Sequence, residues 1–320
     1  MGLVVHHYEI LEQIGRGAMA RVHKAKNKQT GAIVAVKFIA KEMLTNKKEM
    51  EALINEYEIG IKFDHPNLIR FFELIESQGN RYLFMEYCSG PTLRKLTHHR
   101  NKLTPQEQIE LALGIAQGLY YLHSQYDKKM QVLFRDLKPE NILMRDESPI
   151  KSTNVVLVDF GISQLLPRSS GMGGLLGFKK KASTEILGTN SYMSPEQTLG
   201  KVLDVRSDIY SFGVILFEIY TGRPPFLSGA QEKMYKEKGS FSYEEGAMSA
   251  QFMREYNEEI RNKHRTTPAP HPKQFTPTIL PEIANLILKL LEKKPESRLQ
   301  SMEYIVLELN KLKKRFGTKT

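Results

Sequence analysis

The chain has 320 residues, of which 41% are hydrophobic and 26% charged, fractions that are ordinary for a folded globular protein and argue against disorder. Its single cysteine, Cys88, excludes an internal disulfide and a cysteine-based zinc cluster, which is typical of a reducing compartment. The net charge of +10 comes mostly from basic residues spread along the chain. Such a distribution favours a solvated basic surface over a nucleic-acid-binding stripe.

The apolar stretches are too short, and too often interrupted by charge, to cross a bilayer. The first ten residues lack the basic start of a signal peptide, and His6 occupies the position where a myristoylation motif has Ser or Thr. We therefore expect a soluble, cytoplasmic protein without a membrane anchor.

The first part of the chain predicts an antiparallel β-meander. Apolar and β-branched runs bounded by turn residues predict strands at 8–15, 20–27 and 32–39, and two more strands flank a turn at 78–80. Apolar residues at helical spacing predict one helix at 47–62.

Beyond this β-rich part the pattern becomes mainly helical. Pro105 lies near the start of a helical pattern at 103–124, and similar patterns recur at 207–220 and 281–292. Residues 228–278 are polar and lack a sustained apolar period, so they predict a long insertion or mobile connector.

These elements together predict an α+β protein in two lobes. Residues 1–87 would form a small antiparallel β lobe with one main helix. Residues 88–312 would form a larger, mainly helical lobe that contains the polar insertion, and residues 313–320 a basic tail.

A glycine-containing hairpin is predicted between the first two strands. Gly15 and Gly17 are separated by one residue, and backbone N–H groups of such a hairpin can cover nucleotide phosphates. Glycine pairs are also common in plain turns, so this signal alone leaves both readings open. Ala20 stands where the usual loop has its third glycine.

Lys37 ends an apolar strand, where its ammonium group needs an anionic partner to offset desolvation. Glu56 on the following helix is the natural counter-charge, and the pair would direct Lys37 toward nucleotide phosphates. A lysine that reaches out to solvent is the alternative.

The sequences VLFRDLKPENIL and VVLVDFG carry the strongest chemical signal, in Asp136, Lys138, Asn141 and Asp159. Phosphoryl transfer needs a carboxylate for the hydroxyl proton, a cation near the γ-phosphate and oxygen ligands for Mg²⁺. Either aspartate alone would more often be a turn or cap residue. Because all four residues follow the lysine–glutamate pair in the expected order, a chance occurrence of the pattern is improbable.

With the SPE sequence at 194–196 and Thr189 before it, these stretches resemble those of eukaryotic-type (Hanks-type) protein serine/threonine kinases, with bacterial members the most similar. The resemblance runs from about Tyr8 to Leu309. It implies a bilobal protein kinase fold. It also implies an enzyme that transfers the γ-phosphoryl group of ATP to Ser or Thr hydroxyls of proteins, itself included, with Mg²⁺ or Mn²⁺ as cofactor.

The resemblance assigns a role to each site residue. Asp136 matches the catalytic base and Lys138 the transition-state cation. Asn141 and Asp159 match the metal ligands, while the lysine–glutamate pair matches the one that positions the phosphates. The residues that would bind the nucleotide are Ile14, Gly15, Gly17, Val22, Ala35, Lys37, Met85, Glu86, Cys88 and Leu143.

Other matches concern the frame of the site. Glu196 of the SPE sequence matches a carboxylate that pairs with an arginine at position 298, and Asp208 matches the anchor of the catalytic loop. Phe134 departs from the family, which usually has histidine there, and cannot donate the imidazole hydrogen bond. Gly60 stands where the family has a bulky apolar residue, so we expect an under-filled contact and a mobile helix around it.

Control through the activation segment, residues 159–196, leaves two readings open. Arg135 implies a cationic pocket that an anion must neutralise. Glu185, four residues before Thr189, could supply a permanent carboxylate where many relatives carry a phosphothreonine. The equally weighted alternative is phosphorylation of a neighbouring hydroxyl, on Thr184, Ser183 or Ser170.

Two other functions were weighed against a kinase. A pseudokinase or scaffold would lack a catalytic residue, and a small-molecule phosphotransferase of related fold would usually lack the SPE segment; the chain lacks neither. The substrate protein is not readable. Glu140 and Glu218 match acids that in some relatives favour basic residues before the phosphorylated site, but Thr92 stands where a third acid is expected, which leaves the preference open.

Overall fold

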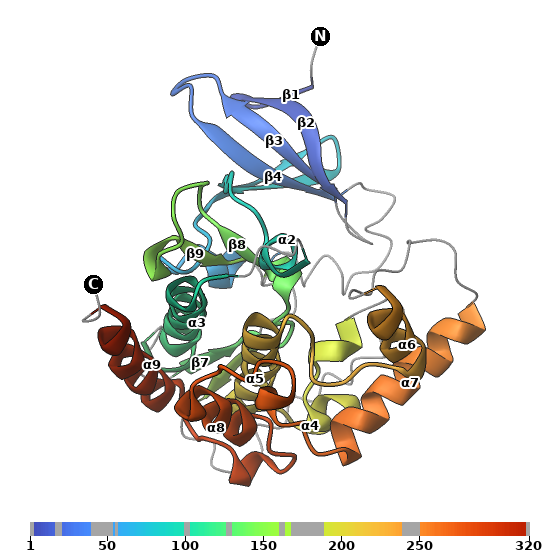
Figure 1. The fold of residues 1–320 in the computed structure, drawn as a ribbon. Helices are drawn as coiled ribbons and strands as arrows, with labels where there is room; N and C mark the ends of the chain where they lie inside the picture. Colours follow the sequence, from blue (N-terminus) through green and yellow to red (C-terminus); the bar gives the residue numbers. More distant parts are fainter. Residues whose placement is uncertain are drawn as a thin grey trace.

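In the computed structural model the chain forms a β-rich lobe, drawn in blue at the top of Figure 1, and a mainly helical lobe below it. The predicted α+β bilobal class is confirmed. Among the residues described, no helix is both long and apolar enough to cross a membrane. The structure describes residues 3–16, 21–39, 54, 57–98, 103–125, 130–159, 164–167, 189–238 and 250–317.

Six antiparallel strands form the sheet of the N-terminal lobe, in spatial order β1-β2-β3-β4-β6-β5. All the strands predicted in this lobe are present, and β1 is an addition that two residues are too few to predict. Of the predicted helix at 47–62, residues 57–60 form a helical turn, and most of the rest lies outside the described residues. The bounds are β1 Val4–Val5, β2 Tyr8–Arg16, β3 Arg21–Asn27, β4 Ile33–Ile39, β5 Phe71–Ser77 and β6 Asn80–Glu86.

The two faces of this sheet differ because alternate residues of a strand point to opposite sides. On one face, Val34, Val36 and Phe84 belong to a small core of the lobe's own. Their neighbours Ala35 and Met85 point to the other face, where Met85 packs against the main core of the protein. The second face therefore looks toward the C-terminal lobe.

Helices α3 and α5 supply the centre of the main core, which α8 and α9 cover with further apolar residues. A capping box begins α3, because Thr104 Oγ1 accepts from the Glu107 N–H group and the Glu107 carboxylate accepts from the Thr104 N–H group. The bounds are α2 Leu93–His98, α3 Pro105–Tyr120, α4 Pro195–Thr198, α5 Val205–Thr221, α6 Gly229–Lys238, α7 Ala250–Thr266, α8 Pro281–Leu290 and α9 Met302–Gly317.

Short strands between the helices carry the catalytic sequences. β7 (Met130–Leu133) pairs antiparallel with β10 (Gln164–Pro167), and β8 (Ile142–Met144) pairs antiparallel with β9 (Val155–Leu157). The segment from β7 to β8 and the residues after β9 therefore lie near one another.

The segment 228–278, predicted to be a long insertion or mobile connector, contains helices α6 and α7 in its described part. In α7, Tyr256, Ile260 and His264 recur every fourth residue and are all buried. This helical period is masked in the sequence by the many charged residues between them. Helix α7 packs against the turn at Thr189–Tyr192 and against α4.

The predicted basic tail from residue 313 also begins inside a helix. α9 continues to Gly317, and Lys313 Nζ lies 2.8 Å from Glu110 Oε1 of α3. Lys313 thus connects the last helix, α9, to α3 by an ion pair. Residues 318–320 lie outside the described residues.

Candidate active site

The predicted metal ligands, far apart in the sequence, meet where β8 begins and β9 ends. Because β8 pairs antiparallel with β9, the residue before β8 lies beside the residues after β9. The Val158 N–H group donates to the Asn141 carbonyl oxygen at 3.0 Å. This hydrogen bond holds Asn141 next to the segment that carries Asp159.

Two of the predicted residues, Lys138 and Asn141, converge on Asp136. Lys138 Nζ donates to Asp136 Oδ2 at 2.7 Å, and Asn141 Nδ2 donates to the Asp136 carbonyl oxygen at 2.9 Å. The side chains of Asp136 and Lys138 are 21% and 20% exposed, so solvent screens their interaction only in part. Since the Asn141 nitrogen faces Asp136, its amide oxygen points to the other side of the amide group.

Lys37 extends from β4 to the other side of this site. Its Nζ donates to Asp159 Oδ1 at 3.1 Å, with the lysine side chain 17% and the aspartate side chain 48% exposed. The lysine therefore has an anionic partner and is not a solvent-facing residue. Glu56, the partner predicted from the sequence, lies outside the described residues, so the Lys37–Glu56 pair stays a prediction.

Two site residues have unusual backbone conformations. Arg135 has φ 69° and Asp159 has φ 68°, in the left-handed region that residues other than glycine seldom adopt. Such residues gather at functional sites, where the surrounding structure holds the strain. Nothing in the sequence pattern indicated them.

Asp208, the predicted anchor, holds the catalytic loop from inside the C-terminal lobe. Its Oδ2 atom accepts from the Phe134 N–H group and its Oδ1 atom from the Arg135 N–H group, both at 2.8 Å. His123 Nε2 lies 2.9 Å from Oδ2. His123 was not singled out from the sequence, because a histidine at the end of a long helix carries no motif of its own.

The pair between Glu196 and Arg298 is present as the resemblance implied. Arg298 Nη1 and Nη2 donate to Glu196 Oε1 and Oε2 at 2.7 and 2.8 Å, and both side chains are buried. Burial alone would raise the pKa of Glu196, but hydrogen bonds and charge from Arg298, together with hydrogen bonds from Ser207 and the backbone, hold that pKa below its usual range. In the next residue, Gln197 Nε2 donates to the Arg135 carbonyl oxygen at 2.8 Å and so joins α4 to the catalytic loop.

The predicted nucleotide-binding residues of the β lobe share one face of the sheet. Val22 pairs with Lys37, and Ala35 pairs with Met85, and directly opposed residues point to the same side. Gly15 is opposite Val22. Because Ala35 and Lys37 are two residues apart on β4, all five lie on the face that looks toward the C-terminal lobe.

The hinge begins at Glu86, the last residue of β6, and includes Cys88. The Glu86 N–H group donates to the Arg70 carbonyl oxygen at 2.8 Å, and its carboxylate pairs with Arg145. Burial raises the pKa of the Cys88 thiol to about 12, so this thiol stays neutral. Any contact of Cys88 with a nucleotide would therefore use its backbone or its apolar side chain.

The other predicted nucleotide contacts are placed by exposure and strand direction. Ile14 is 44% exposed, beside an irregular point in the pairing of β2 with β3. Leu143 is the half-buried middle residue of β8, and its two neighbours point into the main core, so Leu143 points the other way. Gly17 lies outside the described residues.

The contact expected to be under-filled at Gly60 is in fact filled. A Cβ atom at position 60 would lie 2.1 Å from Cε2 of Phe71, which is buried at the start of β5. The aromatic ring therefore takes the volume that a larger residue 60 would need. The prediction of an under-filled contact is wrong because Phe71, far from residue 60 in the sequence, supplies the missing volume.

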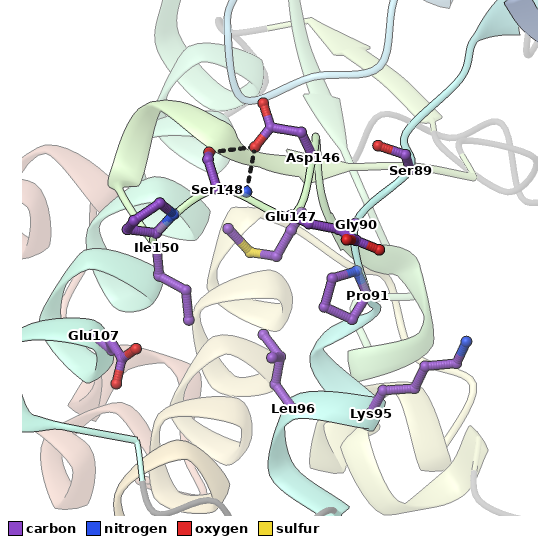
Figure 2. A pocket seen from close by; sticks show the side chains of 12 residues that line it. Ser89, Gly90, Pro91, Lys95, Leu96, Glu107, Asp146, Glu147, Ser148 and Ile150 are labelled. Atoms are coloured by element: carbon purple, nitrogen blue, oxygen red, sulfur yellow. Dashed lines mark hydrogen bonds between the residues drawn. The ribbon is translucent and has the colours of Figure 1, made fainter.

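A pocket of about 540 Å³ lies beside the hinge and is lined by other residues than the predicted site residues (Figure 2). In Figure 2, Leu96 of α2 points into the pocket, Lys95 points away from it, and Ser148 hydrogen-bonds Asp146 in the opposite wall. None of its lining residues is a predicted catalytic or nucleotide-binding residue.

Arg94, which the sequence did not indicate, contacts both Glu140 and Glu218. It donates to Glu140 and to Glu218, in each case at 2.8 Å. A pairing between residues so far apart in the sequence has no local signal.

The hydroxyls and Glu185 considered for control of the activation segment lie outside the described residues, so both readings stay predictions.

The chain is similar to known protein kinases. The protein kinase domain family matches residues 8–308. A protein of Streptomyces coelicolor described as a probable serine/threonine-protein kinase is 29% identical over 306 residues, covering 94% of this chain and 39% of that protein. The serine/threonine-protein kinases PknB of Mycolicibacterium smegmatis and PrkC of Bacillus subtilis are 28% and 29% identical, each over 92% of this chain and over 41% and 39% of their own length.

The chain spans about two-fifths of the length of these relatives. The family match, in contrast, covers nearly all of this chain, including both lobes and every residue predicted for the site. The chain belongs to the protein kinase domain family.

Proposed function

We propose that the chain is a protein serine/threonine kinase, which transfers the γ-phosphoryl group of ATP to Ser and Thr hydroxyls of protein substrates and of itself. The observation that carries the proposal is the convergence of Lys138 and Asn141 on Asp136, beside the segment in which Asp159 meets Lys37. The names of the bacterial relatives support Ser and Thr as acceptors.

The oxygen donors at the site fit a magnesium–nucleotide complex. Mg²⁺ prefers one or two protein oxygens together with phosphate oxygens and water. Asp159 offers a half-exposed carboxylate and Asn141 an amide oxygen, on segments joined by the Val158–Asn141 hydrogen bond. When bound, the metal ion would neutralise the charge of the phosphates.

The other residues orient the reactants around that position. Asp136 would accept the proton of the attacking hydroxyl, and Lys138, beside it, would stabilise the charge that develops on the phosphoryl oxygens. Lys37 would bind phosphate oxygens from the β lobe. Because Asp208 holds the loop by two backbone hydrogen bonds, these groups need little rearrangement before reaction.

Transfer of labelled phosphate tests the proposal. Purified protein is incubated with ATP labelled at the γ-position, with and without Mg²⁺ and a generic protein substrate, and phosphoamino acids are then identified. We expect metal-dependent label on Ser and Thr of the substrate and of the chain. Asp146→Asn, which changes an aspartate of the pocket wall, should behave as wild type.

The same assay separates the alternatives. A folded protein that binds nucleotide but transfers no label would indicate a pseudokinase or scaffold. Label found only on small molecules would indicate a small-molecule phosphotransferase. The cytoplasmic location and the lobe boundaries at residues 87 and 312 stay predictions.

A further inference from the structure

Arg94 joins helix α2 to the catalytic segment and to helix α5. Its Nε atom donates to Glu140 Oε1 and its Nη1 atom to Glu218 Oε1, both at 2.8 Å. Its Nη2 atom donates to the Tyr192 hydroxyl at 2.7 Å. One guanidinium group thus binds two carboxylates and a phenol together, a geometry that depends on its fixed fork of donors.

Glu218 is buried within this cluster and accepts from three donors. Its side chain is 4% exposed, and besides Arg94 its Oε1 atom accepts from the Thr97 hydroxyl at 3.4 Å. Its Oε2 atom accepts from the Tyr192 hydroxyl. A buried carboxylate needs such partners to offset desolvation. While Arg94 is in place, the 4% exposure of Glu218 leaves almost no surface for a cation from outside.

Glu140 is the open side of the cluster and lies close to the proposed chemistry. It is 48% exposed, and it directly precedes Asn141, whose amide nitrogen contacts Asp136. A polypeptide extends about 3.5 Å per residue, so side chains within about four residues of a hydroxyl held at Asp136 can reach Glu140. The cluster therefore borders the path of a protein substrate.

We infer that Arg94 determines substrate preference by filling, from within the chain, the cation-binding position that Glu140 and Glu218 would otherwise offer to a basic substrate side chain. The inference rests on the proposed kinase function and adds a substrate class, proteins in which no basic residue near the acceptor is needed. A substrate arginine would have to compete with Arg94, which is held next to both acids at high effective concentration.

A peptide library tests this role. Each peptide has a central Ser or Thr, and one other position at a time is fixed as Arg or as Ala. The wild type should phosphorylate the two forms at similar rates at every position. For Arg94→Met, the ratio of the phosphorylation rates of the Arg and Ala forms should rise about tenfold at one position, which is the effect of one charge-assisted hydrogen bond. This rise should come from a lower KM for the Arg form, with kcat unchanged.

Two further variants keep the test decisive if Arg94→Met fails to fold, since it leaves the Glu218 carboxylate buried without its cation. Arg94→Met/Glu218→Gln removes both buried charges together and should give the same shift through Glu140 alone. Adding Glu140→Gln should abolish that shift. Lys95→Met removes an exposed cation from the next position of the helix and should keep the wild-type ratio.

A purely structural role of Arg94 would change stability without creating a preference at one peptide position. A folded double variant with wild-type ratios at every position would overturn the inference, as would a wild type that already favours Arg about tenfold. A folded wild type that phosphorylates no peptide and no protein would overturn the proposed function itself. The two failures are therefore distinguishable.

Discussion

Lys37 and Asp159 form an ion pair between the lobes, although each is expected to face a different part of the nucleotide complex. At 3.1 Å the lysine fixes the position of the carboxylate, and both groups are proposed to contact the nucleotide complex. Pairing both charges costs less than leaving a nearly buried ammonium group alone. The pair is therefore consistent with a site whose charged groups are placed before the nucleotide binds.

Lys37→Met is expected to lower kcat/KM for ATP by about 10²-fold, as removal of one preorganised donor usually does. Steady-state transfer of labelled phosphate measures this change. Lys26→Met, which removes an exposed lysine from the neighbouring strand, is the matched control and should keep wild-type kinetics. Wild-type kcat/KM in a folded Lys37→Met protein would remove Lys37 from the proposed mechanism.

At the scale of elements, Arg298 connects the start of α4 to the C-terminal end of the core. Arg298→Ala leaves Glu196 buried without its cation, so we expect a loss of about 3–5 kcal/mol in the free energy of unfolding. Urea unfolding measures the loss. Lys311→Ala breaks a pair on the surface of α9 and should leave the unfolding curve unchanged. Equal curves for both variants would contradict the expected role of burial.

Helix α7 holds the turn at Thr189–Tyr192 through a neutral histidine. His264 Nε2 donates to the Ser191 carbonyl oxygen at 3.0 Å, and Nδ1, 2.9 Å from the Tyr210 hydroxyl, can accept from it. Burial, reinforced by the nearby Lys293 ammonium, lowers the pKa of His264 to about 3 from an ordinary value of 6.5. The folded protein therefore excludes a proton that the unfolded chain binds.

The sign of the pH dependence follows from this difference. Below about pH 6.5 the unfolded chain gains a proton and is stabilised, so the free energy of unfolding falls as the pH decreases toward 3. Between pH 6.5 and 5.0 the histidine should contribute a loss of about 1.5 kcal/mol, which His264→Gln should lack. Urea unfolding at the two pH values compares them. An equal loss in wild type and variant would show that His264 does not cause it.

Gly60 and Phe71 form a complementary pair between the helical turn at 57–60 and strand β5. Gly60→Leu should cost about 1–3 kcal/mol through overpacking, and Phe71→Ala about 3–5 kcal/mol through a cavity. Phe71→Ala frees the volume that the larger side chain of Gly60→Leu can fill. The double variant should therefore lose less free energy of unfolding than the sum of the two single losses. Thermal and urea unfolding of the three variants test this coupling, and strictly additive losses would contradict it.

At the scale of the whole molecule, the sequence predicts those elements and site residues that a local residue pattern or an ordered motif specifies. Apolar and β-branched runs bounded by turn residues predict the strands of the β lobe. The order of Asp136, Asn141 and Asp159 predicts the proposed catalytic centre. Helix α7 was missed because three buried positions among charged ones give a weak apolar period. The Arg94 cluster was missed because it joins side chains whose proximity depends on the complete fold.

The proposed chemistry depends most directly on Asp136, and one comparison tests it. Asp136→Asn keeps the size of the side chain but removes the carboxylate that would accept the hydroxyl proton. Labelled-phosphate transfer gives kcat, while calorimetry with Mg²⁺ and an ATP analogue gives nucleotide affinity. We expect kcat to fall by about 10²–10⁴-fold with nucleotide affinity and melting temperature unchanged. A folded Asp136→Asn protein with near wild-type kcat would contradict Asp136 as the catalytic base.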